Sequence, residues 1–128
     1  MQQLSGVVAL EGVITIGTTN YGDDIDPALK RSQRLGLHFD FNPLLYPERF
    51  NLLGVLFKGR IDSTVDLAKI ASLADQFTGA DLQMLSQMSF DEAYKRSRSS
   101  GIDLSQVKIN AVDIDTAFKL YKKLKFKI

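Results

Sequence analysis

The chain has 128 residues, of which 45% are hydrophobic and 24% charged, and its formal net charge is +1. This composition is typical of a soluble globular protein, and the near-neutral charge gives no reason to expect nucleic acid or a membrane surface as a partner. The lack of cysteine excludes disulfides and thiol catalysis, and it fits a reducing compartment such as the cytoplasm. A single histidine, His38, argues against a Ser-His-Asp triad and a histidine-based metal site. No apolar run approaches the roughly 20 residues of a membrane helix, and we expect no signal peptide.

The first 42 residues predict strands with one short helix between them. Residues 13–16 (VITI) are β-branched throughout, which indicates a strand buried on both faces, as in a parallel sheet. Asp26 followed by Pro27 is typical of a helix start, and that helix should end near Arg31. Apolar and polar residues alternate over residues 37–41, which predicts a second strand. Because a βαβ unit alone takes about 30 residues, we expect an α/β remnant, the end of a larger parallel-sheet domain.

After residue 45 the pattern changes to that of helices. Pro47 can open a helix that stops at Gly59, and the apolar residues of 67–74 recur at helical spacing. A capping box begins a third helix near Gly79, and a similar one begins the last helix near residue 110. The last helix is expected to bury Ile114, Ala117, Phe118, Tyr121 and Leu124. We therefore divide the chain into residues 1–45, the α/β part, and residues 46–128, an all-α domain of about four helices.

Three segments, in order and at matching spacing, resemble the AAA ATPase family. Residues 13–20 (VITIGTTN) look like its buried strand ending in Thr-Asn, and residues 25–34 (IDPALKRSQR) look like Leu-Asp-Pro-Ala-Leu followed by two arginines spaced by three. Residues 77–82 (FTGADL) are similar to the Gly-Phe-Ser-Gly-Ala-Asp-Leu signature of the family's helical lid. The resemblance implies the end of a P-loop ATPase subdomain followed by a four-helix lid.

The sequence also departs from the family pattern. Neither the phosphate-binding loop, Gly-x-x-x-x-Gly-Lys-Ser/Thr (Walker A), nor the acidic Walker B strand occurs in these residues. Residues 32–33 (SQ) replace the usual Pro-Gly, Gln76 replaces the first glycine of the lid signature, and Thr78 replaces its serine. We therefore expect this chain alone neither to bind ATP with Mg tightly nor to hydrolyse it.

The resemblance implies a role for five residues. Asn20 would be sensor 1, which bonds the γ-phosphate and the attacking water, and Arg31 and Arg34 would be arginine fingers reaching a neighbouring subunit's ATP. Gly79 and Ala80 would let an adenine nucleotide approach the lid closely. The plainer alternatives are an Asx-turn at Asn20, solvated surface charge at the two arginines, and an ordinary capped helix start.

The implied function is ATP-driven remodelling of a protein substrate by a ring of identical AAA subunits. The alternative is a non-enzymatic interaction or regulatory module that docks on complete AAA subunits. Arg49 is interpreted as structural. The lysines of residues 119–127 are interpreted as a solvated helix face, and nucleic-acid binding through them is a weaker option.

Overall fold

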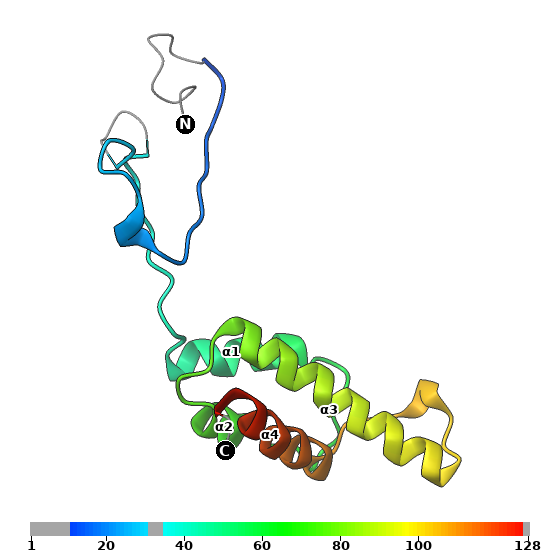
Figure 1. Cartoon of the computed structure of the whole chain (residues 1–128). Helices are drawn as coiled ribbons and strands as arrows, with labels where there is room; N and C mark the ends of the chain where they lie inside the picture. The colour runs from blue at the N-terminus through cyan, green and yellow to red at the C-terminus, as the bar shows by residue number, and fades with distance from the viewer. Residues whose placement is uncertain (1–10, 31–34, 127–128) are drawn as a thin grey trace. The chain divides into compact units, whose positions relative to one another are not determined.

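The computed structural model describes residues 11–30 and 35–126, and the chain divides into two compact units, Met1–Phe41 and Asn42–Ile128. The second unit contains the four α-helices of the described residues, which Figure 1 labels. They are α1 (Tyr46–Leu56), α2 (Leu67–Leu73), α3 (Gly79–Ser100) and α4 (Ala111–Phe126). Two single 3-10 turns, η2 (Gly22–Asp24) and η3 (Leu104–Gln106), complete the helices and turns of the described residues. The all-helical character predicted for the second part of the chain is confirmed.

The ends of α1 and α3 follow from local chemistry. Pro47 lies in the first turn of α1, and the Glu48 carboxylate accepts a hydrogen bond of 2.8 Å from the N–H of Leu45. Gly59 and Gly101, beyond the C-termini of α1 and α3, have φ angles of +71° and +67°. This left-handed backbone favours glycine, which has no Cβ to clash with the carbonyl oxygen.

The remaining helix starts are capped by side chains. The Asp66 carboxylate accepts a hydrogen bond of 3.1 Å from the N–H of Lys69 at the start of α2. At the start of α4, Asn110 accepts from the N–H of Asp113 at 2.9 Å, and Asp113 accepts from the N–H of Asn110 at 3.0 Å. Reciprocal bonds of this kind satisfy two backbone donors that a helix start leaves without partners.

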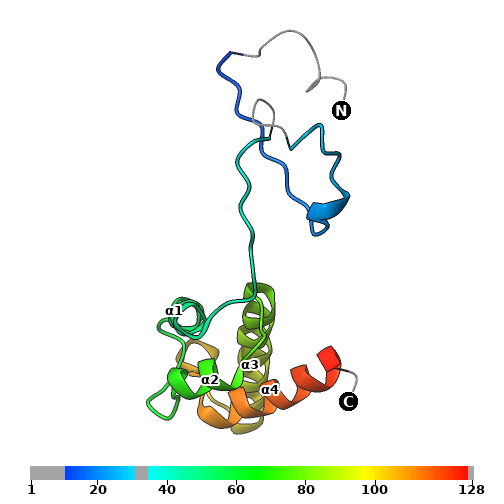
Figure 2. The same ribbon diagram turned by 90° about the vertical axis from the view of Figure 1, so that its left-hand side faces the viewer.

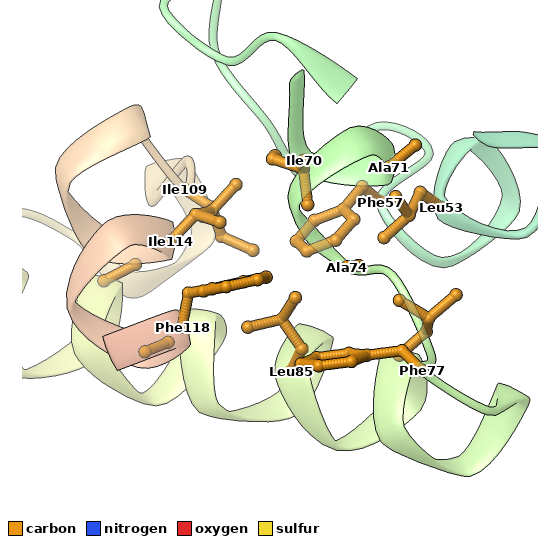
Figure 3. Close-up of a cluster of buried hydrophobic side chains, with 13 residues drawn as sticks. Leu53, Phe57, Ile70, Ala71, Ala74, Phe77, Leu85, Ile109, Ile114 and Phe118 are labelled. Atoms are coloured by element: carbon orange, nitrogen blue, oxygen red, sulfur yellow. The ribbon is translucent and has the colours of Figure 1, made fainter. Parts of the chain in front are cut away.

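The core of the second unit lies where the helices meet (Figure 3). In this unit α4 packs against α3 (Figure 2), and α1 contacts both α2 and α3. Phe77, just before α3, is fully buried; its ring stacks on Phe118 at a centroid distance of 5.4 Å and meets the edge of Tyr121 at 5.6 Å. A single parallel bridge between Ile61 and Ile109 ties the α1–α2 connection to the chain before α4. Leu124, expected in the core, is instead 63% exposed.

In the first unit, the part of the chain that the structure describes contains no strand. Residues 13–16 and 37–41 are extended but unpaired, with Ile14 88% and Phe41 96% exposed. The helix expected after Asp26 is only a hydrogen-bonded turn over the described residues 27–30. A strand is stabilised by pairing with its neighbours, and apolar residues alone do not provide that. The predicted α/β character is therefore not seen in this unit.

No helix in the described ranges combines the length and the apolar character that crossing a membrane requires.

Candidate functional site

The site predicted by the lid-like segment lies at the N-terminus of α3. The Thr78 hydroxyl accepts a hydrogen bond of 3.2 Å from the N–H of Asp81 and donates one of 2.9 Å to the Asp81 carboxylate, which also accepts from the N–H of Thr78 at 2.7 Å. The capping box predicted from the sequence is thus confirmed. It fixes the first turn of the helix and, with it, the backbone of Gly79 and Ala80.

Gly79 and Ala80 are small, accessible residues in this turn. Ala80 is exposed and Gly79 is partly exposed. A Cβ added to Gly79 would lie 3.7 Å from Cδ2 of Leu52, an ordinary van der Waals contact, so packing inside the unit does not require glycine there. Two small residues beside free helix N-terminal amides leave room for a ligand to reach the backbone.

Asp81 also receives two side chains from α4. The Tyr121 hydroxyl donates to Oδ1 of Asp81, and the Lys125 ammonium pairs with Oδ2. Burial opposes ionisation of the Asp81 carboxyl, but the hydrogen bonds from Lys125, Tyr121 and Thr78 outweigh it and lower the pKa to about 2. Burial, together with the bond to Asp81, raises the pKa of Tyr121 to about 12. Asp81 is therefore an ionised carboxylate engaged on both oxygens, which suits a structural role rather than proton transfer.

Tyr121 and Lys125 were not predicted from the sequence as members of this cluster. Tyr121 was assigned to the core, and Lys125 to a solvated face. Their spacing of four residues, which puts two side chains on one face of a helix, is the signal that could have linked them. No such signal pointed to Asp81, because it lies on another helix.

Arg49 is structural, as predicted. Its side chain is 7% exposed, and its Nε donates to the carbonyl of Ala71 at 2.9 Å while Nη1 donates to the carbonyl of Leu44 at 2.6 Å. The same Nη1 lies 3.4 Å from the exposed carboxylate of Asp75. Arg49 thus ties the start of α1 to the end of α2, and its guanidinium is occupied within the unit.

The remaining predicted site residues belong to the first unit. Asn20 is exposed; the local turn is made by Thr19, whose hydroxyl accepts from the N–H of Tyr21 at 3.0 Å. Within the described part of the chain the Asn20 amide makes no hydrogen bond, so it is not used in the Asx-turn given as its plainer alternative. Arg31 and Arg34 lie outside the described residues. Over the described ranges, no group of three or more His, Cys, Asp or Glu residues could hold a metal ion.

A helical unit with a capped, small-residue start on its longest helix agrees with the lid of an AAA ATPase. No protein-family model matches the chain. Curated relatives do match it: the human peroxisomal ATPase PEX1 is 41% identical over 86 residues, which are 66% of this chain and 7% of that protein. The ATP-dependent zinc metalloprotease FtsH 2 of Symbiobacterium thermophilum is 35% identical over 108 residues, 84% of this chain and 18% of that protein. The vesicular-fusion protein sec18 of Schizosaccharomyces pombe is 28% identical over 127 residues, 88% and 16% respectively.

The chain belongs to the AAA ATPase family and matches the C-terminal part of its ATPase module. It spans less than a fifth of the length of each of these relatives.

Proposed function

We propose that this chain is the C-terminal part of an AAA ATPase module, in which it contributes to the ATP binding and hydrolysis that drive remodelling of a protein substrate. The observation that carries the proposal is the capped start of α3, where Gly79 and Ala80 lie accessible beside free backbone amides. The family of the curated relatives supports ATP, with Mg, as the ligand of the whole module.

The chemistry of the α3 start fits an anionic nucleotide. Free N–H groups and the helix dipole favour negative charge at this end of a helix. The nearby Asp81 carboxylate would oppose an anion, but Lys125 pairs with it and compensates its charge. We infer that Gly79 and Ala80 receive the adenine nucleotide through backbone contacts and close approach.

Asn20 and the two arginines would act on the phosphates. A side-chain amide both donates and accepts, so Asn20 could bond the γ-phosphate and orient the attacking water as sensor 1. Arg31 and Arg34 would reach the ATP of the neighbouring subunit, where a planar, permanently charged guanidinium stabilises the charge of the transferred phosphoryl group. Action on a neighbour's ATP implies a ring of AAA subunits.

The apolar side chains of the first unit fit the proposed domain division. Ile14, Ile16, Phe39 and Phe41 are each at least 77% exposed. As the end of an AAA nucleotide-binding subdomain, residues 1–45 would have these side chains covered by further strands and helices of that subdomain. Residues 46–128 would then be its lid.

The test is a chimeric module in which this chain replaces the aligned 108-residue segment of the Symbiobacterium FtsH 2. We expect no ATP turnover from the isolated chain and measurable turnover from the chimera. In the chimera, Arg31→Ala should lower kcat by about 10³-fold, the usual contribution of an arginine finger. Lys30→Ala, which removes a neighbouring cation, is the matched control and should leave kcat unchanged.

Mixed subunits test action in trans. Chimeric subunits with Arg31→Ala are mixed with subunits whose phosphate-loop lysine, in the FtsH part, is replaced by alanine. Each variant alone should be inactive, but the mixture should recover activity where an intact arginine faces an intact phosphate loop. Full turnover by Arg31→Ala alone would exclude the finger role. An inactive chimera, combined with inhibition of intact FtsH 2 by the isolated chain, would favour a regulatory module instead.

A further inference from the structure

Two side chains of α4 contact the residues on either side of the Gly79–Ala80 pair. On the C-terminal side, Tyr121 and Lys125 each bond one oxygen of Asp81. On the N-terminal side, the Tyr121 ring packs edge-on against Phe77 at 5.6 Å, and the Lys125 ammonium lies 4.9 Å from the centroid of the same ring. The same two side chains therefore contact both ends of the segment that carries the small residues.

These contacts are stronger than ordinary surface contacts. Phe77 is fully buried and Asp81 is 9% exposed, so both anchors are fixed in the unit. A hydrogen bond to a charged group that is largely shielded from water contributes more than one between exposed groups, and a cation over an aromatic face adds to it. The neighbouring Lys123, by contrast, is exposed and makes no ion pair or ring contact within the described residues.

We propose that Tyr121 and Lys125 are positioning residues, which hold the Gly79–Ala80 turn of α3 in the conformation that binds the nucleotide. This inference rests on the proposed function, because it needs the nucleotide to contact that turn. Lys125 has a second effect, since its cation compensates the Asp81 carboxylate beside the place that an anion would occupy. Binding of a nucleotide to the lid would thus depend on how α4 packs against α3.

The first experiment measures amide hydrogen exchange in the 128-residue chain. Lys125→Met and Tyr121→Phe should speed exchange about tenfold at the amides of Thr78, Asp81 and Leu82, because each removes a hydrogen bond that closes this turn. The core amides of Phe57 and Ala71 should keep their rates. Lys123→Met removes the same charge without removing a contact and should change neither group of amides.

Two results of this experiment would overturn the inference. One is equal exchange at the turn in Lys125→Met and Lys123→Met. The other is a uniform increase over the whole unit, since that would indicate a loss of global stability rather than of local positioning.

The second experiment measures ATP turnover by the chimeric module with FtsH 2. Lys125→Met should raise KM for ATP about tenfold and leave kcat unchanged, because it disturbs the lid contact and not the phosphate chemistry. Lys125→Arg, which keeps the cation, should restore most of the affinity, and Lys123→Met should leave KM unchanged. A variant that merely loses stability would lower activity without this separation of KM from kcat.

An Ala80→Leu variant separates this inference from the function on which it rests. Ala80 is exposed, so a larger side chain there would block a ligand without disturbing the core. If Lys125→Met loosens the turn but leaves KM unchanged, the positioning role is wrong. If Ala80→Leu then raises KM, the proposed contact between the nucleotide and the lid still holds. If Ala80→Leu leaves KM unchanged, that contact is wrong as well.

Discussion

The two units of this chain differ in how far they bury their apolar side chains. In the first, Val13, Ile14 and Phe39 are 58%, 88% and 77% exposed, although they lie in segments whose pattern is that of strands. In the second, Leu53, Phe57 and Leu85 are fully buried among four helices. An amphipathic helix completes its own backbone hydrogen bonds and needs a partner on one side only. A strand inside a parallel sheet needs neighbouring strands along its edges and covering elements on both faces.

The difference shows that a segment with the pattern of a strand forms one only when neighbouring strands pair with it. A short segment cannot supply those strands alone. The helical unit meets its requirement from residues 42–126, because its four helices face each other across one core. Variants that change one unit and leave the other unchanged test this difference.

The largest difference is expected for a phenylalanine in each unit. Phe77→Ala should cost about 3–5 kcal/mol, because Phe77 is fully buried and stacks on Phe118. Phe39→Ala should change stability by less than about 0.5 kcal/mol, because its ring is mostly exposed. Urea unfolding followed by circular dichroism measures both. A similar loss for the two variants would show that Phe39 contributes to a packed structure.

A smaller loss of stability is expected when the buried guanidinium of Arg49 is removed. Arg49→Met should cost about 2–3 kcal/mol, because it leaves the carbonyls of Leu44 and Ala71 without their charged donor. Arg60→Met, at an exposed position, is the control and should be nearly neutral in the same unfolding experiment. If Arg49→Met were as stable as the parent, the tie between α1 and α2 would not contribute to folding.

The third expectation is a loss of stability in acid. The pKa of Asp81 is lowered from 3.8 to about 2 in the folded chain, so the stabilisation is present above pH 3.8 and is lost as the pH falls towards 2. About 2 kcal/mol should disappear over this range. Asp81→Asn should flatten that part of the stability curve, measured by thermal unfolding between pH 2 and 5.

Asp40→Asn, an exposed carboxylate of the first unit, is the matched control for the acid experiment. Its stability curve should keep the shape of the parent's. An Asp81→Asn curve that also keeps this shape would show that the bonds from Tyr121 and Lys125 do not favour the carboxylate.

The smallest expected effect is a gain in stability. Gln76 has a φ of +63°, and it stands where the family's lid signature begins with glycine. A left-handed residue with a Cβ costs about 1–2 kcal/mol, which glycine would remove. The greater freedom of glycine in the unfolded chain offsets part of that gain. Gln76→Gly should therefore stabilise the second unit by about 0.5–1 kcal/mol and raise its Tm. Gln76→Ala keeps the Cβ and should give no gain; equal Tm values for the two would remove backbone strain as the explanation.

Local patterns predicted most of the helical unit. Thr78 with Asp81, Asn110 with Asp113, and the glycine at 59 each act on residues within one turn, so their effect can be inferred from spacing alone. The prediction was wrong for Leu124, which continues the apolar pattern of α4 but lies mostly exposed, at 63%. Periodicity indicates which face of a helix is apolar, but not how far along the helix its partner extends.

The same distinction separates the two parts of the candidate site. The identity of Gly79 and Ala80 and their place at a helix start follow from a few adjacent residues. The meeting of Asp81 with Tyr121 and Lys125, 40 and 44 positions further along, does not, and neither does the reach of Arg49 to the carbonyl of Ala71. Capping and turn geometry act over three or four residues, whereas contacts between helices depend on the angles at which whole elements pack, and these arise only when the core forms.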